Sequence, residues 1–433
     1  MEDILAQAKK VTEEAEVFMV STDETLVQFE ANRLKHIQSK QSTALALRVI
    51  KDGKIGYATT TDLNDQNLVD MAIETAQFGT PARYELPSIK SYPEVKIFDP
   101  GIESISSKEM INLGEKMVTI ITDNTPDILC EADITKSIMS VRIINSNGGQ
   151  ASYKQSIFSL GIEGQIIHDT DMLFVGEGQS SCHPIKEIDA ITSVVLRQLE
   201  LSKNQASVPT KSLPVIFTPD GIASTMVMPL ISAFNGKVVL EGASPIGNKI
   251  GEMVFDKNLS LWDDATIDYR LGSHPCDDEG IPSQRTPLIK KGVVTNFLYD
   301  LQTASLAGTK STGNGHRSRG SLPTPSPNSF ILSTGNTSFN DMVKDIKEGL
   351  VIEQVMGASH GNLLGGDFSG NVLLGYKIEN GKIIGRVKDT MISGNIYNLL
   401  KQIAAIGNDN KWVSSFLNTP SLYFSNVSIA TKN

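Results

Sequence analysis

The densest group of side chains able to do chemistry is an acidic run, Asp277-Asp278-Glu279, which lies between Cys276 and Gly280. Adjacent carboxylates can accept hydrogen bonds, act as a general base or supply oxygen ligands to a hard cation. Runs of acids also occur on solvated loops, so the pattern alone leaves these roles open. A second stretch, residues 311–317, combines Gly and Asn in a way that tight turns or left-handed backbone explain.

Histidine and cysteine spacing gives the most specific sign of a metal site that one sequence can show. None of the six histidines is followed by glutamate, which excludes a His-Glu-x-x-His motif: His36, His168, His183, His274, His316 and His360. Cys182-His183 and His274-Pro275-Cys276 each bring two soft ligands together without a companion pair. Surface or packing roles explain these pairs better than a metal site does.

One Gly-x-Ser-x-Gly match stands at 357–361, with Ser359 at its centre. A hydrolase nucleophile elbow needs a helix directly after the serine, and residues 362–366 are a poor helix start. The glycine-rich segment 365–370 lacks the Lys-Ser/Thr of a phosphate-binding loop. The sequence therefore predicts no catalytic residue and no nucleotide site.

Composition and charge exclude several classes of protein. With 433 residues, 40% apolar and 20% charged, the chain has the composition of a folded globular protein of two or three domains. Its net charge is −10 and it has no run of Lys or Arg, which argues against binding nucleic acid. The apolar stretches 213–219 and 222–235 fall short of the roughly 20 residues of a membrane span. Three scattered cysteines and an acidic N-terminal start favour a cytoplasmic location.

The N-terminal part predicts two similar units of helix, four strands and helix. In the first unit, a helix within 2–13 and a helix capped by Asp62 enclose strands at 16–21, 25–31, 44–50 and 54–58. After a proline-rich connection at 80–100, a helix capped by Ser107 and a helix at 184–200 enclose strands at 128–135, 137–145, 152–168 and 172–178. We expect a duplicated domain; the alternative is that many α+β chains can be divided in this way.

A polar segment with one proline, residues 202–212, has the composition of an interdomain linker. Beyond it, a strand at 213–217 and a helix at 219–234 precede many short β-rich runs separated by Gly-containing turns. A late helix at 395–406 and a strand at 421–429 complete the chain. The sequence predicts an α+β protein: an N-terminal duplicated α/β sheet domain, 1–201, and a β-rich C-terminal domain, 213–433.

Taken in order, motifs over residues 240–410 resemble the TldD/PmbA family, whose members are also called modulators of DNA gyrase. The matching stretches are Gly242-Ala243-Ser244, Lys249-Ile250-Gly251-Glu252, Asp277-Asp278-Glu279-Gly280, Leu288-Ile289-Lys290-Lys291-Gly292-Val293, Asp300 with Ala304, Ser311-Thr312-Gly313-Asn314, Met356-Gly357, Gly366-Asp367-Phe368-Ser369, Ile378-Glu379-Asn380-Gly381, and Gly394-Asn395 with Gly407-Asn408-Asp409. Their order and spacing make the resemblance specific over this range, and the N-terminal layout fits it more loosely.

The resemblance implies a cytosolic metallopeptidase system of two related subunits, TldD and TldE (PmbA), that degrades or trims unfolded peptides. TldD-like chains carry a His-Glu-x-x-x-His helix before the Gly-x-Ser segment and a Cys near the C-terminus. The corresponding residues here are Val227-Met228-Pro229-Leu230-Ile231-Ser232 and Trp412-Val413-Ser414-Ser415-Phe416, which contain no zinc ligand. This chain therefore resembles the metal-free, TldE-like subunit: it is expected to be non-catalytic on its own, with zinc in a TldD-like partner.

Such a subunit is expected to pair with the metal-bearing relative, or with a second copy, and to shape a groove for an extended peptide. The candidates for the polar lining of this groove are Asp277, Asp278, Glu279, Asn314 and Arg317. An alternative is that these residues hold loops together within the β-rich domain. For the whole protein, the alternatives are a homodimeric, non-catalytic peptide-binding protein and a gyrase-related regulator.

Overall fold

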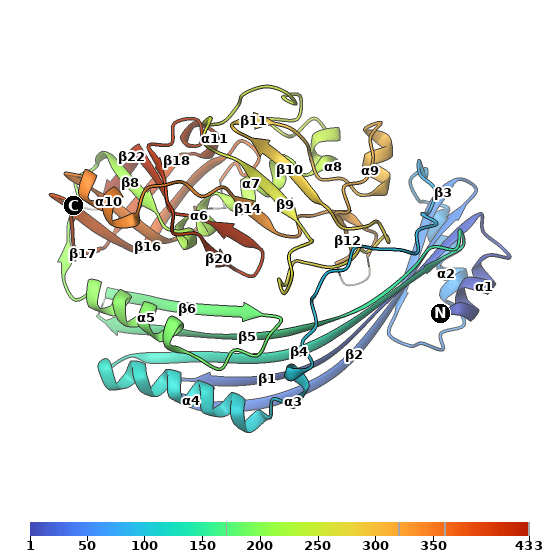
Figure 1. Ribbon diagram of the computed structural model, residues 1–433, viewed down its shortest axis with the longest axis horizontal. Helices are drawn as coiled ribbons and strands as arrows, with labels where there is room; N and C mark the ends of the chain where they lie inside the picture. The colour runs from blue at the N-terminus through green and yellow to red at the C-terminus, as the bar shows by residue number, and fades with distance from the viewer. Residues whose placement is uncertain (170, 319–320, 359–360, 432–433) are drawn as a thin grey trace.

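The structure, a computed structural model, describes residues 1–433 except 170, 319–320, 359–360 and 432–433. Its N-terminal part is an antiparallel sheet of six strands in the order β3-β2-β1-β4-β5-β6 (Figure 1). The pairing of β1 with β4 joins two halves of three strands each, so the predicted duplication is two halves of one sheet. The strands are β1 (Glu14–Glu30), β2 (Arg33–Lys51), β3 (Lys54–Thr60), β4 (Leu129–Asn145), β5 (Gln150–His168) and β6 (Asp171–Ser181).

Each half has three strands where the sequence predicts four. The runs 16–21 and 25–31 both belong to β1, and the runs 128–135 and 137–145 both belong to β4. The polar residues between the runs have the composition of a turn, yet Ser21 pairs with Thr43 of β2 without a break. Their hydroxyl oxygens lie 3.0 Å apart. Polar cross-strand pairs thus continue the strand through a stretch that lacks apolar alternation.

Helices cover the sheet at both ends (Figure 1). α1 (Glu2–Ala8) and α2 (Leu68–Ala76) pack at one end, and α4 (Ser107–Asn124) and α5 (Asp189–Leu201) cover the other, with the short α3 (Gly101–Ser104) before α4. The N-cap of α4 is Ser106 and not Ser107, because Ser106 and Glu109 form a reciprocal capping box. α2 begins after Asn67, later than predicted, because Asp62 accepts from Asn64 N in a turn instead.

The proline-rich connection between the halves runs along the outer edge of β5. Gln150 N donates to Ile89 O and Ser156 N donates to Ile97 O, each at 3.0 Å. Asn145 Nδ2 also donates to Pro87 O at 2.8 Å. These hydrogen bonds order a segment that has no regular secondary structure of its own over most of its length.

The C-terminal part contains a closed ring of five strands. In order around the ring, β15, β8, β22, β18 and β16 each hydrogen-bond to the next, and β16 returns to β15. β17 and β7 continue beyond β16, and β19 pairs with β22. The strands are β7 (Gln205–Ala206), β8 (Lys211–Phe217), β15 (Glu348–Met356), β16 (Asp367–Glu379), β17 (Lys382–Val387), β18 (Thr390–Asn395), β19 (Ala405–Ile406) and β22 (Leu422–Thr431).

A second sheet has the strand order β11-β10-β9-β14-β21-β20, and a short hairpin pairs β12 with β13. These strands are β9 (Leu261–Asp264), β10 (Arg285–Lys290), β11 (Val293–Val294), β12 (Gly315–His316), β13 (Thr324–Pro325), β14 (Phe330–Leu332), β20 (Lys411–Val413) and β21 (Leu417–Thr419). The helices of this part are α6 (Pro219–Thr225), α7 (Val227–Phe234), α8 (Gly236–Leu240), α9 (Leu301–Leu306), α10 (Phe339–Asp345) and α11 (Ile396–Leu399).

Three C-terminal elements differ from their predicted form. The helix predicted at 219–234 is divided at Met226 into α6 and α7, because Pro229 has no N–H to continue the hydrogen-bond ladder. The helix predicted at 395–406 is only the four residues of α11. Residues 205–206 of the predicted linker form β7, which pairs with β17.

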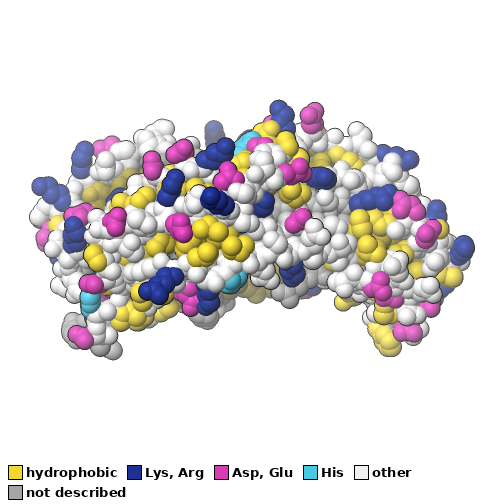
Figure 2. Space-filling view, turned by 90° about the horizontal axis from the view of Figure 1, so that it is seen from below, with side chains coloured by type: hydrophobic (Ala, Val, Ile, Leu, Met, Phe, Trp, Pro, Cys, Tyr) yellow, Lys and Arg dark blue, Asp and Glu magenta, His cyan; other side chains and the backbone are white. Residues whose placement is uncertain are grey.

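One apolar core connects the N-terminal sheet to the ring. Val195 of α5 and Leu160 of β5 share a buried cluster with Ile216, Val351 and Tyr376 of the ring strands. On the face seen in Figure 2, Lys and Arg side chains are interspersed with Asp and Glu. Of the helices in the described residues, none is long and apolar enough to cross a membrane.

Candidate functional site

The predicted groove residues lie where β1 and β2 meet loops of the C-terminal part. Together with residues from those strands they form a polar cluster, which is largely removed from solvent. Asp277 and Glu279 are each 1% exposed and Asn314 is 0% exposed. The members of the polar cluster are Glu16, Arg48, Asp263, Asp277, Asp278, Glu279, Asn314, Arg317 and Asn328.

A chain of four buried charges crosses this cluster. Arg317 donates to Glu16 Oε1 through Nη2. Arg48 donates from Nη2 to Glu16 Oε2 at 3.0 Å and from Nη1 to Glu279 Oε1 at 2.5 Å. The order of charges is therefore positive, negative, positive, negative, and each acid of the chain lies against at least one guanidinium. Since Glu16 and Arg48 come from β1 and β2, the chain ties the N-terminal sheet to the loops.

Asp277 and Asp278 accept hydrogen bonds from the backbone of nearby loops. Asp277 Oδ1 accepts from Glu279 N at 3.0 Å and from Ile281 N at 2.9 Å, and its Oδ2 accepts from Gly315 N at 2.9 Å. Asp278 Oδ2 accepts from Arg317 N at 2.8 Å. A Cβ on Gly315 would lie 2.5 Å from Glu279 Oε2, so only glycine fits this approach. The two loops are thus held together through carboxylates.

Asn314 belongs to a second set of contacts centred on Asp263 of β9. Asn314 Nδ2 donates to Asp263 Oδ2 at 2.7 Å, and Asn328 Nδ2 donates to the same oxygen at 2.8 Å. The Oδ1 of Asn328 in turn lies 2.8 Å from His274 Nε2 and 2.6 Å from His316 Nε2. Asn314 Oδ1 is buried and has no hydrogen-bond partner in the described residues.

Burial dominates the electrostatics of the cluster. It raises the pKa of Asp263 to about 6, against hydrogen bonds from Asn314 and Asn328 that lower it. Burial also raises the pKa of Asp277 and of Glu279, the latter opposed chiefly by the charge of Arg48. The pKa of His274 falls to about 3 because of burial and the neighbouring His316. The arrangement is suited to holding charges in fixed positions, with His274 neutral near pH 7.

The structure brings all five predicted residues together and adds partners that the sequence analysis missed. Glu16 and Arg48 had a signal in the sequence, because each charge interrupts an apolar strand pattern, as Arg48 does within residues 44–50. Asp263 and Asn328 gave no comparable signal. Whether the five candidates also line a peptide groove stays a prediction.

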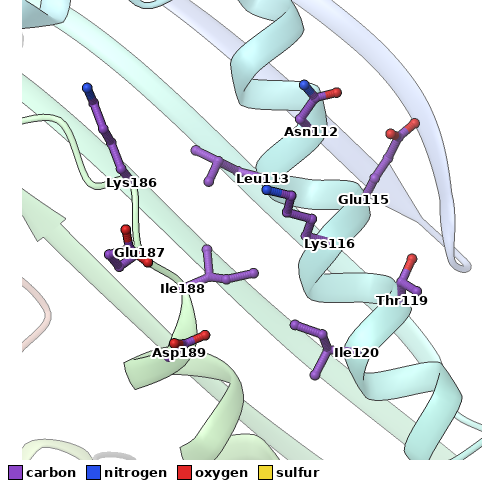
Figure 3. A pocket seen from close by; sticks show the side chains of 10 residues that line it. All are labelled: Asn112, Leu113, Glu115, Lys116, Thr119, Ile120, Lys186, Glu187, Ile188 and Asp189. Atoms are coloured by element: carbon purple, nitrogen blue, oxygen red, sulfur yellow. The ribbon is translucent and has the colours of Figure 1, made fainter.

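Two hollows in the described surface differ in their place relative to this cluster. One, of about 380 Å³, lies beside the polar cluster: Leu301 N donates to Glu279 Oε2 at 2.7 Å, and both Leu301 and Ile281 line the hollow. The other, of about 500 Å³, lies between α4 and the start of α5 (Figure 3). Its polar lining mixes signs: Lys116 and Lys186 stand with Glu115, Glu187 and Asp189.

The positions where the family resemblance would put zinc ligands carry apolar, thioether and hydroxyl side chains in this chain. Val227 of α7 is 3% exposed, Met228 is 49% exposed, and Ser232 ends the corresponding segment. Residues 412–416 span β20 and the turn to β21 and offer indole, valine, hydroxyl and phenyl groups. These side chains do not fit a zinc ion, which needs imidazole, carboxylate or thiolate. In the described residues, His, Cys, Asp and Glu nowhere form a group of three that could hold a metal.

The ammonium group of Lys411 lies next to α6. Lys411 Nζ of β20 lies 2.5 Å from Glu177 Oε2 of β6 and 3.1 Å from Asp220 Oδ2 of α6.

The Gly-x-Ser-x-Gly match follows β15, but Ser359 and His360 lie outside the described residues.

Comparisons with known proteins agree over nearly the whole chain. Residues 210–431 match the model of the PmbA/TldA metallopeptidase C-terminal domain, and residues 15–76 match that of PmbA/TldA metallopeptidase domain 1. An uncharacterized protein of Methanocaldococcus jannaschii is 30% identical over 93% of both chains, and the metalloprotease PmbA of Escherichia coli O157:H7 is 26% identical over 91% of this chain and 87% of its own. The crystal structure of TldE from Thermococcus kodakarensis superposes with a TM-score of 0.90, at 21% identity over 99% of each chain.

Proposed function

Because this chain belongs to the PmbA/TldD metallopeptidase family, we propose that it is the metal-free, TldE-like subunit of a two-component peptidase acting on unfolded peptides. The observation that carries the proposal is α7, where Val227, Met228 and Ser232 stand in place of the family's zinc ligands. Without imidazole and carboxylate donors, this helix cannot activate a water on zinc. The proposed partner is a TldD-like chain that supplies the metal.

In this proposal the polar cluster acts on the peptide through the residues that it holds beside the hollow. Glu279 holds the backbone N–H of Leu301, and Leu301 and Ile281 face the neighbouring hollow. Asp277 holds Ile281, which lies on a loop separate from Leu301, by accepting from its N–H. The five groove candidates would therefore set the shape of the peptide path even where their own side chains are buried.

The proposed location is the cytoplasm. Cys130, Cys182 and Cys276 are all buried and unpaired, which suits a reducing compartment.

A stable pair of subunits would bury roughly 2,000 Å² or more at its interface.

The test is to purify the chain alone, and together with a TldD-like relative, and to measure zinc content and cleavage of a reduced, carboxymethylated polypeptide. We expect no stoichiometric zinc in the chain alone, and cleavage only by the mixture. A relative whose first motif His is changed to Ala is the matched control and should abolish cleavage. Zinc-dependent cleavage by this chain alone would refute the proposal, and so would a relative whose full activity needs no second subunit.

A second experiment addresses the groove candidates. The triple variant Asp277→Asn, Asp278→Asn, Glu279→Gln should unfold at lower temperature, because each lost acceptor leaves a buried N–H unpaired at a cost of about 1–3 kcal/mol. If the acids line the groove directly, cleavage by the two-chain complex falls at a temperature where the variant is still folded. A folded triple variant whose complex cleaves at the parental rate would contradict a role in the peptide path.

A further inference from the structure

In the described residues, the outer edge of β2 has no neighbouring strand over more than half of its length. β3 pairs with residues Leu45 to Lys51 of β2, and the described part of the chain places no strand beside the remainder of that edge. All ten residues from Arg33 to Ser42 are exposed. A long strand edge with unpaired N–H and C=O groups is a ready template for another strand, and proteins normally cover or shorten such edges.

The other half of the same sheet shows what covers an edge of this kind. β5 holds the place of β2 in the second half, and both strands have 19 residues. Counted from the start of each strand, Ser39 of β2 corresponds to Ser156 of β5. Ser156 N donates to Ile97 O of the extended connection, whereas the matching segment of β2 has no such segment beside it in the described residues. In the second half of the sheet, this edge is therefore covered by an extended segment of the chain itself.

The backbone groups that are available on β2 follow from its pairing with β1. Ile50 O accepts from Glu13 N, so even-numbered residues of β2 direct their backbone groups at β1. Odd-numbered residues alternate with them and direct theirs outward, as Leu45 and Val49 do toward β3. By this alternation the free donors and acceptors belong to Ile37, Ser39 and Gln41, before the register shift opposite Gln28.

Charge distinguishes between the possible occupants. The exposed segment carries Arg33, Lys35 and Lys40 and has no Asp or Glu, although the whole chain has a net charge of −10. Lys35 pairs with Glu30 of β1, whereas Arg33 and Lys40 have no ion-pair partner in the described residues. A second copy paired at the same edge would bring these positive charges together, which is unfavourable. An extended peptide with acidic side chains would instead place opposite charges across the new pair.

We propose that the outer edge of β2, from Ile37 to Gln41, binds an extended acidic peptide segment as an added antiparallel strand. The geometry is that of the connection along β5: main-chain hydrogen bonds hold the segment, and Arg33 and Lys40 select for its charge. The choice of a peptide as occupant agrees with the proposed function, on which it rests in part. The contact itself needs neither zinc nor a second subunit.

The test uses the full chain and a fluorescein-labelled peptide of alternating Thr and Glu, about twelve residues long, the length that spans the free edge. Fluorescence anisotropy should show saturable binding that weakens at high salt. Ser39→Pro removes one outward N–H and should weaken binding about tenfold. It also removes the hydroxyl contact of Ser39 with Thr25 Oγ1 of β1, at 3.1 Å, which the control variant loses too. Ser39→Ala, the matched control, loses the same hydroxyl but keeps the N–H, and should bind within about twofold of the parent.

Hydrogen exchange on the unmodified chain supplies a readout that needs no variant to fold. Peptide binding should slow exchange at the amides of Ile37, Ser39 and Gln41, while the amides that face β1 do not change. No binding, equal binding by Ser39→Pro and Ser39→Ala, or protection that appears without peptide as the protein concentration rises would overturn the proposal. The last result would assign the edge to a second copy. Zinc-dependent cleavage by the two-chain complex is measured separately, so either proposal can fail alone.

Discussion

The N-terminal sheet meets the rest of the molecule at two junctions of opposite chemistry. At the polar junction, Glu16 and Arg48 of the sheet are interleaved with Glu279 and Arg317 of the C-terminal loops, all of them buried. At the apolar junction, α5 and β5 pack on Ile216, Val351 and Tyr376 of the strand ring. The long strands β1, β2, β4 and β5 run between these two ends of the sheet (Figure 1).

The two junctions should lose stability in different ways when a residue is replaced. Apolar contacts lose stability in proportion to the area removed, and most single changes leave the remaining contacts in place. Buried charges instead depend on every partner, because removing one leaves its neighbour charged and unpaired in a medium that solvates it poorly. The polar junction is therefore the more specific connection and also the more fragile one.

The largest expected effect is from Arg48→Met at the polar junction. In the described residues, Arg48 is the only ion-pair partner of Glu279 and one of two for Glu16, so its loss leaves buried acids uncompensated. We expect the free energy of unfolding to fall by about 3–5 kcal/mol, measured by urea denaturation. A loss below about 1 kcal/mol would show that the two junctions do not differ in the way described.

A pH titration tests the part of the polar cluster around Asp263, on the C-terminal side of the polar junction, without changing its packing. The pKa of Asp263 is raised by burial to about 6 from an ordinary value of 3.8, so the folded state holds a proton between these values that the unfolded state has lost. Its contribution to stability is therefore present below about pH 4 and is lost as the pH rises through about 6, by about 3 kcal/mol at most. In Asp263→Asn this decline should be absent from the stability profile. An unchanged profile in that variant would assign the decline to another group.

At the apolar junction, Ile216→Val removes one methylene from a fully buried side chain. The expected loss is about 0.5–1.5 kcal/mol, with no dependence on salt or on pH between 4 and 7. Thermal unfolding in low and high salt measures it. A strongly salt-dependent loss would mean that this junction also relies on charge.

The smallest effect is expected from Lys411→Met, at the rim between β6 and α6. Lys411 pairs with Glu177 and Asp220. Although the side chain of Glu177 is only 7% exposed, solvent reaches Lys411 itself, which is 33% exposed, and Asp220, which is 47% exposed. Exposed pairs contribute about 0–1 kcal/mol, and salt screens them. Urea denaturation in low salt should show a loss within that range, well below that of Arg48→Met; an equal loss would contradict the ranking.

Local patterns in the sequence were enough to predict part of this architecture. α4 and α5 follow from apolar spacing at helical period, and the acidic run 277–279 stands out because its charges are adjacent. The full length of β1 could not be predicted, because its central polar residues lack apolar alternation and are held by pairing with β2 and β4, which no local pattern shows. The ion pair between Arg48 and Glu279 could not be predicted either, since the two residues lie 231 positions apart in the sequence and only the fold brings them together.

The central pairing of β1 with β4 has a consequence for synthesis on the ribosome. Phe29 pairs with Ala132, about a hundred residues later in the chain. At a translation rate of about 5–20 residues per second, β1 and β2 wait roughly 5–20 s for the strand that completes them. During that interval the nascent hairpin exposes one edge at β1 as well as the edge of β2 that stays free in the finished sheet. A nascent chain arrested before residue 129 should therefore aggregate or recruit a chaperone, and one arrested after β4 has emerged should do so far less.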